Sequence, residues 1–80
     1  MTVSAEISLY PLRAEYGEGV RAFVDGLMER VDLQVDVGSM STIIAGEYEA
    51  VMAAIQEECL PVFRAGAAVV VVKISNACPR

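Results

Sequence analysis

The sequence contains no histidine and no tryptophan, and it has only two cysteines and three prolines among its 80 residues. Without histidine and with only two cysteines, neither a histidine-based catalytic arrangement nor a common zinc-ligand set can be assembled. The two cysteines, Cys59 and Cys78, do not have metal-ligand spacing. We therefore expect no metal and no cofactor. Few cysteines and no signal-like start predict a cytoplasmic protein with free thiols.

Long hydrophobic runs and positive charge are also scarce. The longest uncharged apolar stretch, AGAAVVVV at residues 65–72, is far shorter than the ~18–20 residues of a membrane span. The formal net charge is −5, and all eleven acidic residues lie before residue 59. Nucleic-acid binding depends on lysine and arginine, so this balance argues against a nucleic-acid partner. It tolerates a cationic ligand but is equally typical of an ordinary acidic surface.

Hydrophobic residues are abundant, at 55% of the chain. The length allows one domain, spanning residues 1–80, because a single core commonly needs at least about 50 residues. A small domain buries only about 60% of the surface that its unfolded chain exposes. The excess of apolar side chains therefore predicts a homo-oligomer.

The hydrophobic pattern divides the chain into six elements. Residues 2–10 alternate between apolar and polar, as in a strand with one covered face. Residues 20–31 and 47–63 have apolar positions at helical spacing, and LQVDVGSMSTIIAG between them predicts a hairpin turning at Gly38. Residues 67–75 form a β-branched run that is apolar at both parities, so both of its faces should be covered.

The order strand, helix, strand, strand, helix, strand predicts a ferredoxin-like βαββαβ sandwich of the α+β class. It has a four-stranded antiparallel sheet with two helices on one face. The other face carries alternate residues of the first and last strands, so half of the last strand should meet a second subunit. Pro61 predicts a kink or a broken end in the second helix. Gly66 is placed to end that helix as a left-handed cap.

Three stretches resemble a known family: ISLYPL closing the first strand, MSTIIAGEYEAVM between the third strand and the second helix, and KISNACPR at the end. Together they are similar to the thiamine- and hydroxymethylpyrimidine-binding proteins of the YkoF-like group. The resemblance covers nearly the whole chain in element order. Its motifs are a Tyr-Pro pair, a Ser-Thr pair followed four residues later by glycine, and a terminal Cys-Pro.

The resemblance implies a protein that binds thiamine or its hydroxymethylpyrimidine half without catalysis, in salvage or transport of vitamin B1. It also implies assembly of single-unit chains into dimers or tetramers. An aminopyrimidine ring needs hydrogen-bonding groups and a flat apolar wall, and a thiazolium cation favours an acid or an aromatic face. We expect the ligand to meet residues of the two central strands and the start of the second helix: Ser8, Tyr10, Ser41, Thr42, Glu47 and Tyr48.

Each of these residues also has a purely structural interpretation. Ser41 and Thr42 are common strand residues, and Tyr10 is suited to a subunit interface. Glu47 is favoured in a first helical turn by the macrodipole, and Tyr48 lies on an apolar stripe. The alternative function is therefore an oligomeric structural or regulatory module without a thiamine site. An enzyme is disfavoured because no acid–base pair has a recognisable spacing.

Overall fold

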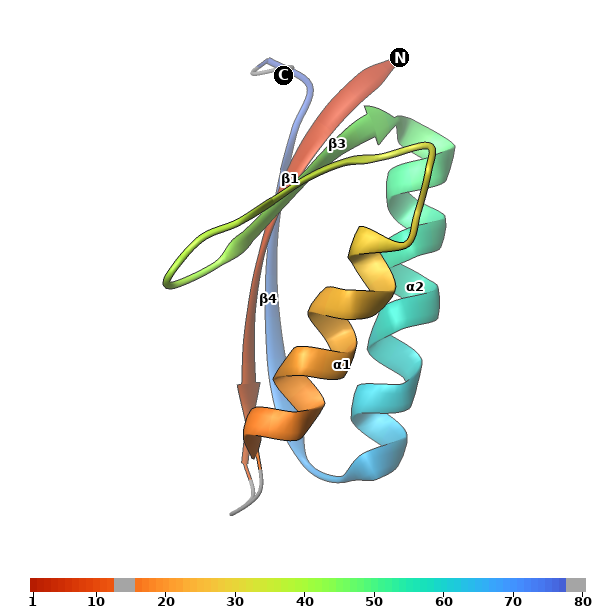
Figure 1. The fold of residues 1–80 in the computed structure, drawn as a ribbon. Helices are drawn as coiled ribbons and strands as arrows, with labels where there is room; N and C mark the ends of the chain where they lie inside the picture. The colour runs from red at the N-terminus through yellow and green to blue at the C-terminus, as the bar shows by residue number, and fades with distance from the viewer. Residues whose placement is uncertain (13–15, 78–80) are drawn as a thin grey trace.

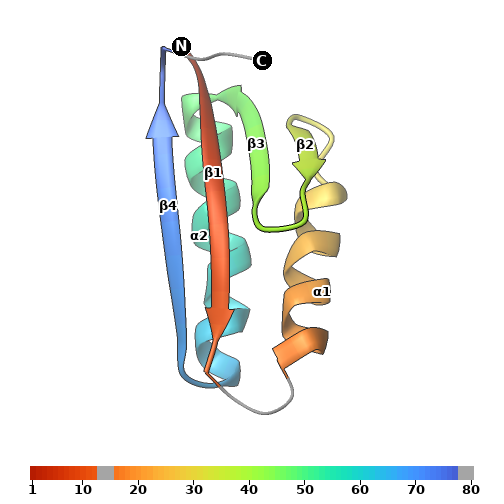
Figure 2. The ribbon, with the colours of Figure 1, turned by 90° about the vertical axis from the view of Figure 1, so that its left-hand side faces the viewer.

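The computed structural model describes residues 1–12 and 16–77, and it contains six regular elements. In chain order they are β1 (Thr2–Pro11), α1 (Tyr16–Met28), β2 (Gln34–Val37), β3 (Thr42–Glu47), α2 (Tyr48–Ala65) and β4 (Ala68–Ser75). The strands form one antiparallel sheet in the order β2-β3-β1-β4. Figure 1 shows the sheet and the two helices as two layers, and Figure 2 views the face that no helix covers. The predicted ferredoxin-like fold is confirmed.

The core lies between the sheet and the helices, and it is built from the alternation in β1. Val3, Ala5 and Ile7 are all at most 2% exposed, as period-two patterning requires of a strand with one covered face. They pack in one cluster with Phe23, Leu27, Ile44, Val51, Ala54, Cys59 and Val62. The intervening β1 residues occupy the uncovered side, which we call the open face.

The apolar stripes predicted for the two helices each end with a residue that is not part of the buried face. Helix α1 ends at Met28, and Val31 lies beyond it, fully exposed. The last turn tightens where the Arg30 amide donates to the Leu27 carbonyl at 3.1 Å, a 3₁₀-type contact that closes the helix. In α2, Phe63 is exposed while Val62 is buried. Adjacent helical residues point about 100° apart, so only one of the two faces the sheet.

The structure also corrects the expected end of α2. The helix is not broken at Pro61 but continues through it to Ala65. Pro61 is exposed, so water can reach the Glu57 carbonyl that loses its helical partner there. Gly66 has φ 155° and ψ −174°, which is not the predicted left-handed cap. Such backbone is nearly restricted to glycine, and it directs the chain straight into β4.

Candidate functional site

The six residues expected to meet a ligand do not lie together. On β1, Ser8 is opposite Val71 and Tyr10 is opposite Val69 in β4. Both belong to the polar set of the β1 alternation, so they lie on the open face. Tyr10 is 53% exposed there. Figure 2 shows both helices behind the sheet when it is viewed from this face.

Glu47 and Tyr48 lie at the opposite end of the sheet from Tyr10. The register pairs Glu47 with Thr2, and β1 runs eight residues from Thr2 to Tyr10. At about 3.3 Å per residue, those positions are separated by roughly 26 Å. The expectation that the start of α2 closes the same site as Tyr10 is therefore wrong. Because β3 runs antiparallel to β1, the last residue of β3 lies beside the first residue of β1.

The Glu47 carboxylate is occupied at its own end of the sheet. It accepts hydrogen bonds from the ammonium of Met1 at 3.1 Å and from the Thr2 hydroxyl at 3.2 Å. These bonds, the N-terminal one first, lower the pKa of Glu47 below that of an ordinary glutamate. Tyr48 is 40% exposed, and its amide donates to the Met1 carbonyl at 2.9 Å. Both residues therefore connect β1 to α2.

The Ser-Thr pair is divided between the two faces of the sheet. Thr42 pairs with Ile7 and shares its covered face, where it is 6% exposed. Ser41 precedes it on the other side, and its hydroxyl donates to the Glu6 carboxylate at 3.0 Å. Lys73 on β4 lies 3.9 Å from the same carboxylate, so Glu6 connects three neighbouring strands on the open face. Adjacent strand residues always point to opposite sides, so the two hydroxyls serve different surroundings.

Thr42 lines a cavity of about 210 Å³, which we call the hydroxyl cavity. The β1–β3 pairing ends at Ile7 and Thr42, so the rest of β1 has no partner strand on that side. Helix α1 and the hairpin loop at residues 38–41 enclose the space that results. The lining residues come from β1, α1 and the hairpin: Ile7, Leu9, Val20, Phe23, Val24, Val37, Gly38, Ser39, Met40, Ser41 and Thr42.

The hydroxyl cavity combines apolar walls with a small number of hydrogen-bonding groups. Thr42 is the one buried polar side chain among residues 1–12 and 16–77, and a hydroxyl can both donate and accept. Ser39 adds a hydroxyl at the hairpin, and Phe23 adds an aromatic ring. Apolar walls with a few orienting polar groups are typical of sites for small organic molecules. A flat heterocycle with ring nitrogens and an amino group is chemically suited to this lining.

Sequence reasoning missed most of the cavity wall. Val20, Phe23 and Val24 were recognisable as an apolar helix stripe, and such a stripe is usually core. The hydrophobic pattern does not show that β3 is shorter than β1. Because of this difference, the part of β1 after Ile7 has no partner strand on the β3 side, and α1 faces that part. The unequal strand lengths, ten residues in β1 and six in β3, are the signal that points to this gap.

Metal binding and membrane insertion are two further functions that the structure bears on. Among the residues that the structure describes, no three histidine, cysteine, aspartate or glutamate side chains are grouped so that they can hold a metal ion. Over the same residues, no helix has the length and apolar character needed to cross a membrane. Cys59 is buried, and burial raises the pKa of its thiol, as expected for a packing residue. Cys78 lies outside the described residues.

Comparison with solved structures shows the same fold in proteins of distant sequence. A Streptococcus pneumoniae protein is 17% identical, with a TM-score of 0.89 over 98% of this chain and 89% of its own. A Methanocaldococcus jannaschii protein is 24% identical, with a TM-score of 0.83 over 99% of this chain and 84% of its own. A Thermotoga maritima protein, named as a candidate thiamine biosynthesis or salvage protein, is 18% identical. Its TM-score is 0.81 over 94% of this chain and 83% of its own.

Sequence comparison is more specific. No curated protein matches the sequence. The family model described as thiamine-binding protein matches residues 5–76, which include all of α1, β2, β3, α2 and β4. The matched range also contains Thr42 and every other residue that lines the hydroxyl cavity. The chain therefore belongs to the thiamine-binding protein family.

Proposed function

We propose that this protein binds thiamine, or its hydroxymethylpyrimidine half, without catalysis and serves salvage or transport of the vitamin in the cytoplasm. The observation that carries the proposal is Thr42, a polar side chain on the covered face that lines an apolar cavity. The Thr42 hydroxyl can both donate and accept a hydrogen bond, and a heterocycle that enters the cavity offers complementary ring nitrogens and an amino group. Family membership supports a thiamine-related role.

The size of the hydroxyl cavity favours the pyrimidine half as the part that enters it. Its volume of about 210 Å³ is below the ~300–1,000 Å³ typical of pockets that hold a whole drug-sized ligand. One ring fits such a space better than two linked rings. The ring nitrogens and amino group would face the hydroxyls of Thr42 and the hairpin, with Phe23 as a flat wall. The thiazolium of intact thiamine would then lie toward solvent.

The lining of the hydroxyl cavity also supports binding rather than catalysis. Its described side chains carry hydroxyls, a thioether and hydrocarbon groups, but no carboxylate, thiol or amine. General acid–base catalysis uses groups whose pKa lies near the working pH, and isolated serine and threonine hydroxyls do not meet that condition. We therefore assign this site a binding role.

We further propose that the open face joins two or more copies of the chain. Tyr10, Val69 and Val71 form its apolar part and are 53%, 47% and 44% exposed. They are cross-strand neighbours, since Tyr10 pairs with Val69 and Ser8 with Val71. Burying such a surface against a second copy would remove apolar area from water at about 25 cal/mol per Å² before the costs of association. Ser8 and Tyr10 would then contribute to assembly rather than to the cavity.

Calorimetric titration with thiamine and with hydroxymethylpyrimidine tests the binding proposal. Thr42→Val removes the hydroxyl with little change in shape, so it should weaken pyrimidine binding by about 1–2 kcal/mol, roughly tenfold. Thr2→Val makes the same chemical change at the far end of the sheet and should leave binding unchanged. Absence of heat with both ligands at millimolar concentration would reject the proposal, as would equal affinity in Thr42→Val.

Gel filtration with light scattering tests the assembly proposal. The unmodified chain should elute as a dimer or larger, and Val71→Lys should shift it toward the monomer. Val31→Lys places the same charge on an exposed turn and should not. A monomeric unmodified chain would refute assembly through the open face. An oligomer that binds neither ligand would instead favour the structural or regulatory module.

A further inference from the structure

The two helices line a second and larger cavity, of about 390 Å³, which shares Phe23 with the hydroxyl cavity. We call it the helix groove. Its apolar wall includes Ala22 and Phe23 from α1 and Pro61 and Val62 from α2. Its polar wall consists of two carboxylates, Glu18 and Glu58. An apolar space whose charged groups are all negative is complementary to a cation with an apolar body.

The helix groove exists because α1 has small residues where it faces α2. Gly19 and Ala22 both line the space, and Gly26 follows on the same side of the helix. None of these residues has a side chain long enough to reach across to α2. At Gly26 the gap is closed by Glu58, because a Cβ built there would lie 2.7 Å from the carboxyl carbon of Glu58. The groove is therefore bounded at that point by a carboxylate.

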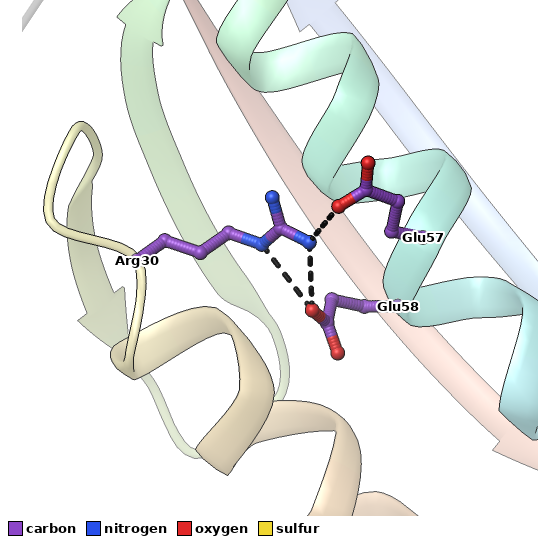
Figure 3. Close-up of polar contacts among 3 residues, drawn as sticks. All are labelled: Arg30, Glu57 and Glu58. Carbon is purple, nitrogen blue, oxygen red and sulfur yellow. Dashed lines mark hydrogen bonds and ion pairs between the residues drawn. The ribbon is translucent and has the colours of Figure 1, made fainter.

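Glu58 is fixed in place by Arg30. The guanidinium donates from Nε at 3.2 Å and from Nη2 at 2.8 Å to the same oxygen, Oε2 of Glu58. It also donates to Glu57 at 2.6 Å. Figure 3 shows that the second oxygen of Glu58 is turned away from Arg30. Only 20% of the Glu58 side chain is exposed, so this carboxylate is largely withdrawn from water and held in one orientation.

The charges around Glu58 do not cancel. One guanidinium faces two carboxylates, so the cluster of Arg30, Glu57 and Glu58 keeps a net negative charge. Glu18 adds another negative charge from the first turn of α1. Of these carboxylates, Glu58 is the one largely withdrawn from water, and its charge acts more strongly than it would on an open surface.

We propose that the helix groove binds a small organic cation with a compact apolar or aromatic body, of the size of benzylammonium. The ammonium would approach the Glu58 oxygen that is turned away from Arg30, with Glu18 about two helical turns away along α1. The hydrocarbon part would pack against Ala22, Phe23 and Val62. A volume of about 390 Å³ is within the range of small-molecule pockets. The inference does not depend on thiamine binding, because Thr42 and the hairpin take no part in the groove.

Titration of isotope-labelled protein with benzylammonium, followed by NMR amide shifts, tests this proposal. Saturable shifts should map to residues 18–23 and 61–65. Benzyl alcohol is similar in size but neutral, and it should bind at least tenfold more weakly. Ala22→Leu fills the groove and should abolish the shifts, and Glu18→Gln should weaken binding at least threefold. Glu49→Gln, an exposed charge in the first turn of α2, is the matched control and should leave binding unchanged.

Several outcomes would overturn the proposal. These are shifts that do not saturate, equal binding of benzyl alcohol, or equal weakening by Glu49→Gln, which would indicate a general charge effect. Shifts confined to residues 37–42 would place the cation in the hydroxyl cavity instead. Thr42→Val separates the two sites, because it should weaken the pyrimidine titration and leave benzylammonium binding unchanged. Either proposal can therefore fail while the other stands.

Discussion

The contact between Gly26 and Glu58 yields a prediction in which the sign of a mutation depends on a second residue. Gly26 lies within α1, and a Cβ at this position would overlap the Glu58 carboxylate. Gly26→Ala therefore forces that carboxylate to move. Because both Arg30 bonds to Glu58 end on this carboxylate, the displacement breaks them.

Two opposing free energies decide the outcome. Replacing glycine by alanine within a helix stabilises the folded state by about 0.5–1 kcal/mol. Hydrogen bonds to charged groups contribute about 1.5–3 kcal/mol, and the Arg30 and Glu58 side chains are both only 20% exposed. Arg30 retains its bond to Glu57, which limits the loss. We expect a net destabilisation of about 0.5–2 kcal/mol for Gly26→Ala.

Urea denaturation of four proteins measures this: the unmodified chain, Gly26→Ala, Glu58→Ala and the double variant. Once Glu58 is shortened, the added methyl group meets no carboxylate and only the gain in helix propensity remains. Gly26→Ala should then stabilise Glu58→Ala by about 0.5–1 kcal/mol, a reversal of sign. If Gly26→Ala changes the free energy of unfolding equally in both backgrounds, the two residues are not coupled and the reasoning is refuted.

Two further predictions concern the ends of the sheet. Gly46→Ala should destabilise the fold by about 1–3 kcal/mol in thermal melts. The added Cβ would lie 2.9 Å from the Leu33 side chain and 3.0 Å from the Asp32 carbonyl. Gly17→Ala is the control and should not destabilise the fold, because the space around Gly17 is open. Because the folded pKa of Glu47 is lowered, its stabilising contribution is present above the ordinary glutamate pKa and lost as the pH falls through the lowered value. Urea midpoints between about pH 3 and pH 7 should therefore vary less for Glu47→Gln, and identical profiles would contradict this assignment.

The fold was predictable because its signals are local and repeated. The alternation through Val3, Ala5 and Ile7 specifies which side of β1 is covered, whatever the rest of the chain does. The element order then leaves few topologies, of which the antiparallel sandwich is one. The ends of α1 and α2 were less predictable because an apolar residue beyond the last turn, such as Val31, continues the spacing without continuing the helix.

The candidate site was predictable only in part. Thr42 was identified from its sequence motif, but its separation from Ser41 follows from strand geometry alone. The positions of Glu47 and Tyr10 depend on the pairing register, which places Glu47 beside the start of β1 and far from Tyr10. Register in turn depends on turn geometry and on side chains from distant segments. The helix groove had no sequence signal beyond the small residues of α1, because its carboxylates come from two helices far apart in the chain.

The hairpin loop has a consequence for how this domain can change. The Gly38 amide donates to the Ser41 carbonyl at 2.9 Å, and this turn fixes where β3 begins relative to β1. If one residue were inserted or deleted there and β3 slipped by one position, Thr42 would turn outward and Ser41 would turn toward the helices. The length of one short loop thus determines which hydroxyl is available inside the protein and which is available to a neighbouring molecule.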